Sequence, residues 1–309
     1  SHKLEEIRAL CDSATILRRG EVVATCDPRE KSARELAEMM VGKVLQQTKA
    51  RGADLGPVAL DVRGLSLPPA TQFGTPLRDV SFSVRKGEVL GIGGVAGNGQ
   101  DELLAALSGE RGTRDGVFVN GQPISKLGPT ARRRIGILSG PEERLGHAAA
   151  PDMSLTENAL LTGHVRENLA RNGFLDWART KAFAERVVKE FDVRTPGVQA
   201  AARSLSGGNL QKFVIGREVL QSPDVLIVNQ PTWGVDAAAA AAIRQSLLDL
   251  AAQGSAVVVI SHGIDKLMEI SDRFSALYGG HLSEAVPAAG LPLDQNGLIL
   301  GGGNHLAPA

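Results

Sequence analysis

A glycine-rich loop, Gly94–Asp101, lies between a predicted buried strand at Glu88–Gly93 and the start of a predicted amphipathic helix at Gln100–Leu107. Its glycines have the spacing at which backbone N–H groups turn inward around phosphate oxygens at the amino end of a helix. A tight turn between a strand and a helix would explain the glycines alone, so the motif needs support from elsewhere in the chain. The residues expected to face a phosphate are Gly94, Gly97, Asn98, Gly99, Gln100 and Asp101.

Two side chains expected of a phosphate loop are missing. In the full motif a lysine follows the last glycine and reaches the terminal phosphates, and the next residue is a serine or threonine that binds magnesium. Gln100 and Asp101 occupy these positions. The lost cation and the added anion each cost roughly 1–4 kcal/mol at about 4 Å, depending on burial. We therefore expect nucleotide binding at this loop to be weak or absent, with adenine stacking on Phe73 restoring part of it.

A longer run, Ser204–Asp236, resembles the most specific sequence of the ATP-binding-cassette (ABC) family. In that family Leu-Ser-Gly-Gly-Gln begins a helix, and a strand ending in Asp-Glu-Pro-Thr follows. Here Leu205–Asn209 reads Leu-Ser-Gly-Gly-Asn, and a predicted strand at Val225–Gln230 follows at the family's distance without a gap. We expect Ser206 to cap the helix and its first amides to be bare for a phosphate. A capped surface helix would explain the local pattern but not this register.

The resemblance assigns further positions and shows what is altered. Asn229 stands where the family has an aspartate that organises magnesium, and Gln230 stands where it has the glutamate that polarises the attacking water. An amide is a poor proton acceptor, so general-base function at Gln230 is lost. Asp236 matches an aspartate in the turn between subunits, and His262 matches the switch histidine that senses the terminal phosphate. Because Asp101 adds a carboxylate where Asn229 removes one, these two residues are the candidate magnesium ligands.

One further element narrows the resemblance to a subgroup. Glu142 stands where the family's γ-phosphate-sensing loop carries glutamine, and its Pro-Glu-Glu-Arg context resembles the second cassettes of importers for simple sugars and nucleosides. ABC cassettes work as head-to-tail pairs, in which each nucleotide lies between one phosphate loop and the other cassette's signature. The altered residues all belong to one site. The signature residues that serve the opposite site are intact, namely Ser206, Gly207 and Gly208.

The resemblance therefore implies a hydrolysis-impaired cassette that completes the ATP site of its partner. Its cofactors are ATP and Mg²⁺, bound weakly or not at all at its own loop. The implied partners are the first cassette of the same chain and transmembrane permease subunits, the latter bound through a helical subdomain. A periplasmic or lipoprotein substrate-binding protein would take part only indirectly. The implied location is peripheral, on the cytoplasmic face of the cell membrane.

An internal repeat predicts how these elements are organised. Ser1–Gly20 aligns without a gap to Ser261–Gly280, with identities that include the initial Ser-His and the final glycine. Residues 1–42 are thus predicted to be the end of a first cassette, 43–57 a linker, and 58–285 a second cassette with a helical subdomain at about 145–202. Residues 286–309 read as a Gly-rich tail. The predicted fold is α/β, a P-loop NTPase-type cassette with helical and antiparallel β subdomains.

Composition limits the remaining possibilities. The 309 residues carry a formal net charge of +0, which gives no support to nucleic acid as the main partner. The two cysteines have no metal-site spacing, and no apolar stretch reaches the roughly 18 residues of a membrane span. The basic run Arg132–Arg134 is predicted to be a solvated helix face. We assign no chemistry to His147, His164, His281 or His305, and the initial serine suggests a fragment.

Two other functions stay open at this point. One is an interaction scaffold that never meets nucleotide, which absence of nucleotide binding by this cassette in the full-length protein would favour. The other is a soluble tandem cassette protein that acts on ribosomes or DNA, which neutral charge and the Pro-Glu-Glu-Arg element disfavour. A fully active ATPase is the least favoured, because the altered positions Gln100, Asp101, Asn229 and Gln230 would all have to be dispensable.

Overall fold

The computed structural model describes residues 4–18, 21–32, 35–36, 39, 55–72 and 74–289 of the chain. Phe73, most of the predicted linker and residues 290–309 of the predicted tail lie outside the described residues.

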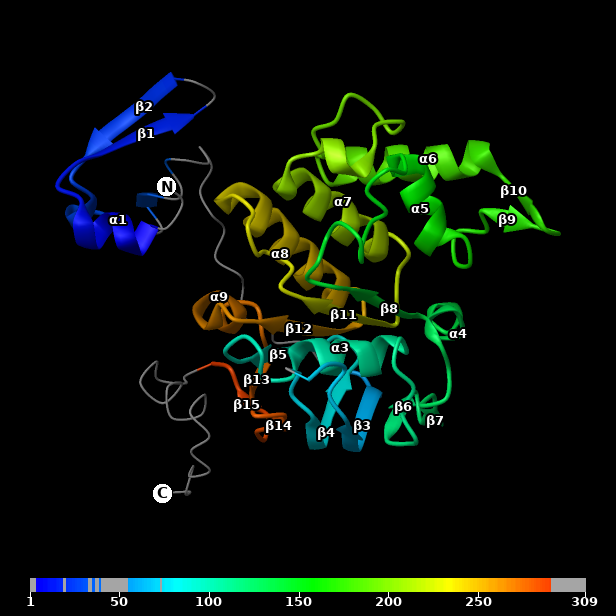
Figure 1. Ribbon diagram of the computed structural model, residues 1–309. Coiled ribbons are helices and arrows are strands. Elements are labelled where there is room, and N and C mark those ends of the chain that lie inside the picture. The colour runs from blue at the N-terminus through cyan, green and yellow to red at the C-terminus, as the bar shows by residue number, and fades with distance from the viewer. Residues whose placement is uncertain are drawn as a thin grey trace, which may run out of the picture.

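A seven-stranded sheet forms the centre of the molecule, in the order β14-β13-β5-β12-β11-β8, with β15 also paired to β13 (Figure 1). Strands β8, β11, β12, β5 and β13 are parallel to their neighbours in this row, whereas β14 and β15 pair antiparallel to β13. The parallel strands are apolar runs buried on both faces, as parallel sheets require. The strand bounds are β5 Val89–Gly93, β8 Ile137–Gly140, β11 Val225–Asn229, β12 Ala256–Ser261, β13 Arg273–Tyr278, β14 His281–Leu282 and β15 Val286–Pro287.

A second, antiparallel sheet and helix α3 (Gln100–Ser108) cover one face of the central sheet. The second sheet has the order β4-β3-β6-β7. Leu103 and Leu107 of α3 pack in one cluster with Val62 of this sheet and Ile227 of β11. The remaining bounds on this side are β3 Val58–Leu67, β4 Leu77–Arg85, β6 Val117–Val119, β7 Gln122–Pro123 and α4 Pro129–Arg134.

The other face is covered by α8 (Ala237–Ala252) and α9 (Ile264–Met268). Ile243 and Leu247 of α8 pack with Leu226 and Val228, whose side chains point away from Ile227 because side chains alternate along a strand. The two faces of the central sheet therefore belong to separate hydrophobic clusters.

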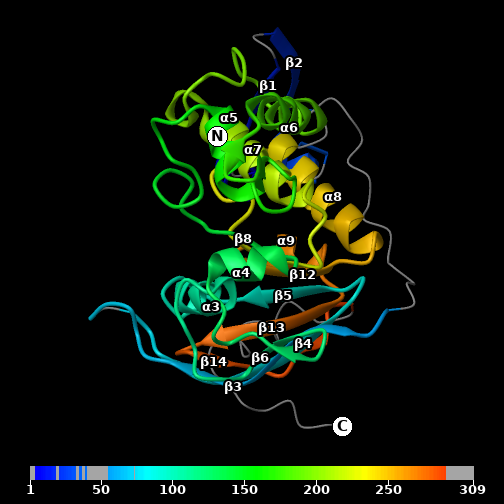
Figure 2. The ribbon, with the colours of Figure 1, turned by 90° about the vertical axis from the view of Figure 1, so that its right-hand side faces the viewer.

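A helical region joins the cassette between β8 and β11, and Figure 2 shows its helices stacked beyond the sheets. Phe183 and Val187 pack in a third cluster with Leu155 and Phe213. The predicted boundaries of the helical subdomain stay a prediction. The element bounds here are α5 Leu155–Gly163, β9 Ala170–Arg171, β10 Phe174–Leu175, α6 Trp177–Glu190, the 3-10 turn η2 Ala202–Ser204 and α7 Gly207–Val219.

The amino-terminal elements repeat the end of the cassette in order and in register. Helix α1 (Leu4–Leu10) precedes strands β1 (Ala14–Arg18) and β2 (Glu21–Cys26), and a 3-10 turn η1 (Pro28–Glu30) follows. In the β1–β2 hairpin residue 17 pairs with 22 and 18 with 21; in β13–β14, 277 pairs with 282 and 278 with 281. The same shift of 260 that aligns the two sequences therefore aligns the two hairpins.

Two details differ from the sequence-based expectation. The basic run is solvated only at Arg134, which is exposed: Arg132 is fully buried, and Arg133, 16% exposed, pairs with the buried Glu218 at 2.7 Å. Arg132 donates to the main-chain oxygens of Ala106 and Leu107 at 2.6 and 2.7 Å, so it binds carbonyls at the end of α3 that have no helical partner. The first two residues of the predicted tail form β15 in the central sheet.

Candidate nucleotide site

The predicted site residues emerge at one edge of the central sheet. Strands β5, β12 and β11 are parallel neighbours, and their registers place Gly93 opposite Ser261 and Asn229 opposite Ile260. The carboxyl ends of parallel strands are where open α/β sheets bind ligands. The phosphate loop, the two amides at the end of β11 and His262 therefore leave the sheet side by side.

The conformation of the loop after β5 requires glycine. Gly97 and Gly99 have φ values of +82° and +110°, a region that side-chain-bearing residues rarely adopt. A Cβ on Gly94 would lie 2.5 Å from the main-chain oxygen of Leu277. The glycine spacing seen in the sequence thus corresponds to a strand–loop–helix turn of the expected shape, closed by α3.

Gln100 is bound to its own loop. Its Oε1 accepts the Asn98 N–H at 2.9 Å, its Nε2 donates to the Val95 oxygen at 2.9 Å, and the side chain is only 4% exposed. The Asn98 N–H, one of the donors that a phosphate would need, is therefore already used. The side chain at the lysine position closes the loop on itself.

Asn98 fastens the loop to the β13–β14 turn. Its Oδ1 accepts the Gly279 N–H at 2.8 Å, its main-chain oxygen accepts the Gly280 N–H at 3.0 Å, and its Nδ2 donates to Val95. Thr75 adds a 2.6 Å bond to the Gly97 oxygen. Loop and turn are thus held together without a ligand.

Asp101 and Asn229, the candidate magnesium ligands, bind each other. Asn229 Nδ2 donates to Asp101 Oδ1 at 3.0 Å. Within the described part of the chain, Asn229 Oδ1 and Gln230 Nε2 are buried without a hydrogen-bond partner. Gln230 also has a φ of +51°, a conformation that costs a non-glycine residue about 1–2 kcal/mol.

The signature residues lie at the amino end of α7, away from the phosphate loop in sequence but along the same cleft. Ser206 is at the N-cap position, as predicted, but its hydroxyl does not cap the helix; it accepts a hydrogen bond from Asn209 Nδ2 at 2.9 Å. Ser206 and Gly207 are exposed. Because the first amides of a helix have no intrahelical acceptor, those of α7 are free to meet an anion.

Asp236 lies beside the signature. It caps α8 by accepting the Ala239 N–H at 2.8 Å, and its Oδ2 would be 3.7 Å from a Cβ on Gly208. The turn 230–236 and the start of α7 therefore lie next to each other.

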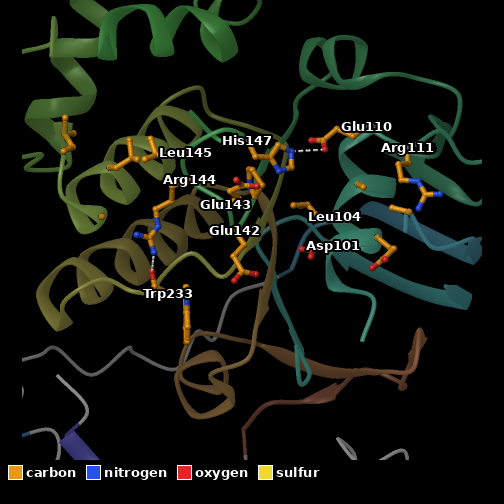
Figure 3. A pocket seen from close by; sticks show the side chains of 17 residues that line it. Asp101, Leu104, Glu110, Arg111, Glu142, Glu143, Arg144, Leu145, His147 and Trp233 are labelled. Atoms are coloured by element: carbon orange, nitrogen blue, oxygen red, sulfur yellow. Dashed lines mark hydrogen bonds and ion pairs between the residues drawn. The ribbon is translucent and has the colours of Figure 1, made fainter. Parts of the chain in front are cut away.

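A cleft of about 800 Å³ extends from Asp101 past Glu142 to Gly207 and Trp233. Figure 3 shows Asp101 and Glu142 among the side chains that line it. Five acidic residues line the cleft, namely Asp101, Glu102, Glu110, Glu142 and Glu143, whereas only two arginines do, Arg111 and Arg144. The cleft beside the phosphate loop is therefore richer in acidic than in basic side chains.

Two residues of this cleft had no assigned role in the sequence. His147 Nε2 lies 2.9 Å from Glu110 Oε2 and so links the start of the predicted helical subdomain to the loop that follows α3 (Figure 3). Arg144 donates to the main-chain oxygen of Trp233. The Pro-Glu-Glu-Arg element was the available signal for Arg144, whereas nothing in the sequence pairs His147 with Glu110.

Among the residues that the structure describes, no group of three or more His, Cys, Asp or Glu side chains is arranged to hold a metal ion. None of the helices described is long and apolar enough to cross a membrane.

Comparison with known proteins assigns the family. The model of the ABC transporter family matches residues 77–233. The nucleoside import ATP-binding protein NupA of Lactococcus lactis subsp. cremoris is 34% identical over 98% of this chain and 60% of its own length. The guanosine import ATP-binding protein NupO of Bacillus subtilis is 36% identical over 95% and 58%, and the glucose import ATP-binding protein TsgD13 of Haloferax volcanii is 37% identical over 100% and 57%. The chain spans 57–60% of the length of these relatives.

Solved structures agree on the fold. An ATP-binding subunit of an ABC transporter superposes with a TM-score of 0.62 at 22% identity, over 79% of this chain and 99% of that one. The ATP-binding cassette MJ0796, solved with ADP and phosphate, gives 0.62 at 20% identity, over 75% and 100%. The predicted α/β cassette fold, with its helical and antiparallel β parts, is thereby confirmed. The chain belongs to the ABC transporter family, whose cassettes bind ATP with Mg²⁺.

Proposed function

We propose that this chain is part of the ATP-binding subunit of an importer for simple sugars or nucleosides, and that its cassette is hydrolysis-impaired. Its signature completes the ATP site of a partner cassette, while its own phosphate loop holds nucleotide weakly or not at all. The observation that carries this proposal is the position of Gln100. Its amide oxygen accepts a hydrogen bond from the Asn98 N–H at 2.9 Å, and its neutral side chain has no positive charge to pair with a phosphate. The nucleoside, guanosine and glucose import relatives support the substrate class.

The residues present do not fit magnesium as the family binds it. Asp101 already accepts a hydrogen bond from Asn229 Nδ2. The Asn229 amide therefore turns its N–H group, and not its oxygen, toward the carboxylate. Asn229 Oδ1 is an available but neutral ligand. Magnesium is held in such sites through carboxylates and substrate phosphates together. With one carboxylate engaged and no lysine to hold the phosphates, we derive no catalytic step through a metal at this loop.

The signature side is free for a nucleotide. Ser206 and Gly207 are exposed, and no side chain caps the first turn of α7. Amides at a helix N-terminus favour an anion. The residues that differ from the family motif thus lie in the phosphate loop and at the end of β11, whereas the unaltered signature residues lie at the start of α7. This separation supports a division of labour between two nucleotide sites.

The proposed partner is the first cassette of the same chain. Support comes from the hairpin β1–β2, which repeats the cross-strand pairs of β13–β14 at the shift of 260 residues found in the sequence. The relatives' greater length is in keeping with a second cassette in the complete protein.

A permease is the second proposed partner, with the helical region as the contact and the cytoplasmic face of the membrane as the location. The exposed Phe174, Leu175 and Trp177 lie together in sequence on β10 and the start of α6, and they support a protein contact there. A substrate-binding protein would act only through the permease.

The proposal is tested by ATP affinity and turnover. Calorimetry and phosphate release are measured on this chain with and without Mg²⁺, and on the restored variant Gln100→Lys/Asp101→Ser/Asn229→Asp/Gln230→Glu. We expect binding at least tenfold weaker than that of the restored variant and no turnover, since the altered charges cost several kcal/mol. Turnover like that of the restored variant would refute the proposal. Absence of binding at this cassette in the full-length protein, with no effect of signature variants there, would favour a scaffold.

A further inference from the structure

The guanidinium of Arg144 lies where three segments meet. These are its own loop 141–145, the start of α7 and the turn 230–236. Arg144 Nη2 donates to the main-chain oxygen of Trp233. A Cβ on Gly207 would lie 2.6 Å from Nη1, and one on Gly234 would lie 2.9 Å from Nη2. The guanidinium therefore fills the space beside both glycines, and Figure 3 shows it directed from its loop toward Trp233.

This is a costly place for a cation in the isolated chain. The amino end of a helix carries positive partial charge, and α7 has no side-chain cap to reduce it. Partial burial lowers the pKa of Arg144, which the charge of Glu142 counteracts. A cation is favourable here when an anion arrives at α7, because the amides and the guanidinium then share one negative charge.

The contacts of Arg144 also join the signature to the turn 230–236. In the pairing proposed above, the signature faces the partner cassette, and the turn 230–236 contains Asp236, which matches an aspartate of the family's turn between subunits. A hydrogen bond to Trp233 and the packing on Gly207 hold these two elements in a fixed relation. Arg144 follows Glu142 by two residues on the same loop. A movement of the loop at Glu142 would thus be transmitted to the start of α7 and to the turn 230–236 through the Arg144 side chain.

We propose that Arg144 is a positioning residue for the ATP site of the partner cassette, aligning the signature at Gly207 with the turn at Trp233. This inference rests on the proposed function, since it needs a nucleotide opposite α7. Arg144 acts through these elements and not on the reacting atoms.

The first test asks whether Arg144 orders the turn, and it uses this chain alone. The sequence has two tryptophans, so Trp177→Phe leaves Trp233 as the only indole reporter. In that background Arg144→Met should lower the fluorescence anisotropy of Trp233 and raise its quenching by acrylamide. Arg144→Lys should restore most of the anisotropy, because lysine donates one hydrogen bond. Anisotropy unchanged by Arg144→Met would overturn the inference.

Arg111→Met is the matched control. Arg111 lines the same cleft and also donates to a main-chain oxygen, that of Pro68 at 2.7 Å, but it lies on the far side from Trp233 in Figure 3. This variant should leave the anisotropy of Trp233 unchanged. A fall equal to that of Arg144→Met would mean a general loosening of the cleft and would also overturn the inference.

The second test measures ATP hydrolysis by the complete tandem subunit assembled with its permease. Arg144→Met should lower kcat roughly tenfold, the effect of one charged hydrogen bond, with KM unchanged because the partner's phosphate loop is intact. Arg144→Lys should recover most of kcat. If Gly207→Asp leaves hydrolysis unchanged, the proposed function itself fails. If Gly207→Asp abolishes hydrolysis but Arg144→Met does not lower kcat, only the role of Arg144 fails.

Discussion

Asp101 and Asn229 together carry one carboxylate, as the family motif does, but here it lies on helix α3 and not at the end of strand β11. The family motif has the acid at the end of the strand and a hydroxyl on the helix. Here the strand carries the amide, 1% exposed, and the exposed helix start carries the acid. An ionised group is costly when it is buried without a partner, whereas at an exposed position water stabilises it. The exchange therefore suits a site that does not depend on a metal to neutralise a buried acid.

Asn229→Asp should destabilise the chain because it sets two carboxylates in contact. With Asp101 at the present 3.0 Å hydrogen-bond distance, the loss in unfolding free energy should be about 2–4 kcal/mol at pH 7. The repulsion raises the pKa of the pair, so the loss should shrink as pH falls and one proton is shared. Urea unfolding between pH 5 and 8 measures it. The control is Asn229→Asp/Asp101→Asn, which keeps the buried acid of the single variant but removes the second one, so the difference between the two variants measures the repulsion. A double variant as unstable as the single would contradict the charge argument.

Gly94→Ala should distort the phosphate loop even though no positive φ is involved. The new Cβ would lie 2.5 Å from a main-chain oxygen, that of Leu277, which cannot move as a side-chain end can. Overpacking of this kind costs about 1–3 kcal/mol. Gly112→Ala is the control, because a Cβ there meets nothing within 4 Å. Equal urea midpoints for the two variants would show that the loop yields at no cost.

At the scale of elements, a buried ion cluster joins α4, α5 and α7. Glu218 of α7 binds Arg133 of α4 at 2.7 Å and Arg217 at 2.9 Å. Arg217 also donates to the main-chain oxygens of Asn158 and Ala148 at 3.0 and 2.8 Å. Breaking one member of such a cluster leaves a buried charge without its partner, which is more costly than the pair itself is favourable.

Glu218→Gln should therefore lower the unfolding free energy by about 3–5 kcal/mol at pH 7. Burial alone would raise the pKa of Glu218, but the charges of Arg133 and Arg217 outweigh it, so the pKa lies below its ordinary 4.5. A lowered pKa gives stability that is present above 4.5 and lost as pH falls. The difference between wild type and variant should thus narrow toward acid pH, which urea unfolding from pH 7 to 3 measures.

An exposed glutamate provides the control for this prediction. Glu190 pairs with Arg186 at 2.8 Å on α6, but both side chains are largely exposed. Glu190→Gln should change the unfolding free energy by less than about 1 kcal/mol at every pH. If the two variants behaved alike, the burial of Glu218 would not be what makes it important.

The sequence predicted elements better than contacts. Glycine spacing, the apolar run Val225–Asn229 and the signature each depend on near neighbours in the chain, and the structure places them in a cassette fold. The prediction of a solvated face was right for Arg134 but wrong for Arg132 and Arg133, because a run of charges does not reveal the end of α3 or the buried Glu218 that these two arginines bind. The bond of Gln100 to its own loop depends on a rotamer, which no spacing rule determines. The sequence shows directly that the lysine is replaced by Gln100, but it does not show that the Gln100 side chain binds Val95 and Asn98 of its own loop.

At the scale of the whole molecule, the buried surfaces and the exposed ones are divided between regions. The central sheet is covered on both faces by separate clusters, whereas the helical region leaves apolar side chains in solvent at β10 and the start of α6. Phe174 is 81% exposed and Trp177 is 49% exposed. Aromatic residues of this kind provide much of the binding energy at protein interfaces.

If the helical region contacts a permease as proposed, Phe174→Ser should weaken that binding without destabilising the chain. Because the side chain is 81% exposed, its removal deletes little buried contact, and the urea midpoint should stay the same. An interface aromatic contributes about 2 kcal/mol, so the affinity for the detergent-solubilised permease should fall roughly thirtyfold. Val58→Ser is the control, since Val58 is an exposed apolar residue on β3, outside the helical region. An unchanged affinity in Phe174→Ser would place the permease contact on another surface, whereas an equal loss in both variants would point to general adhesion.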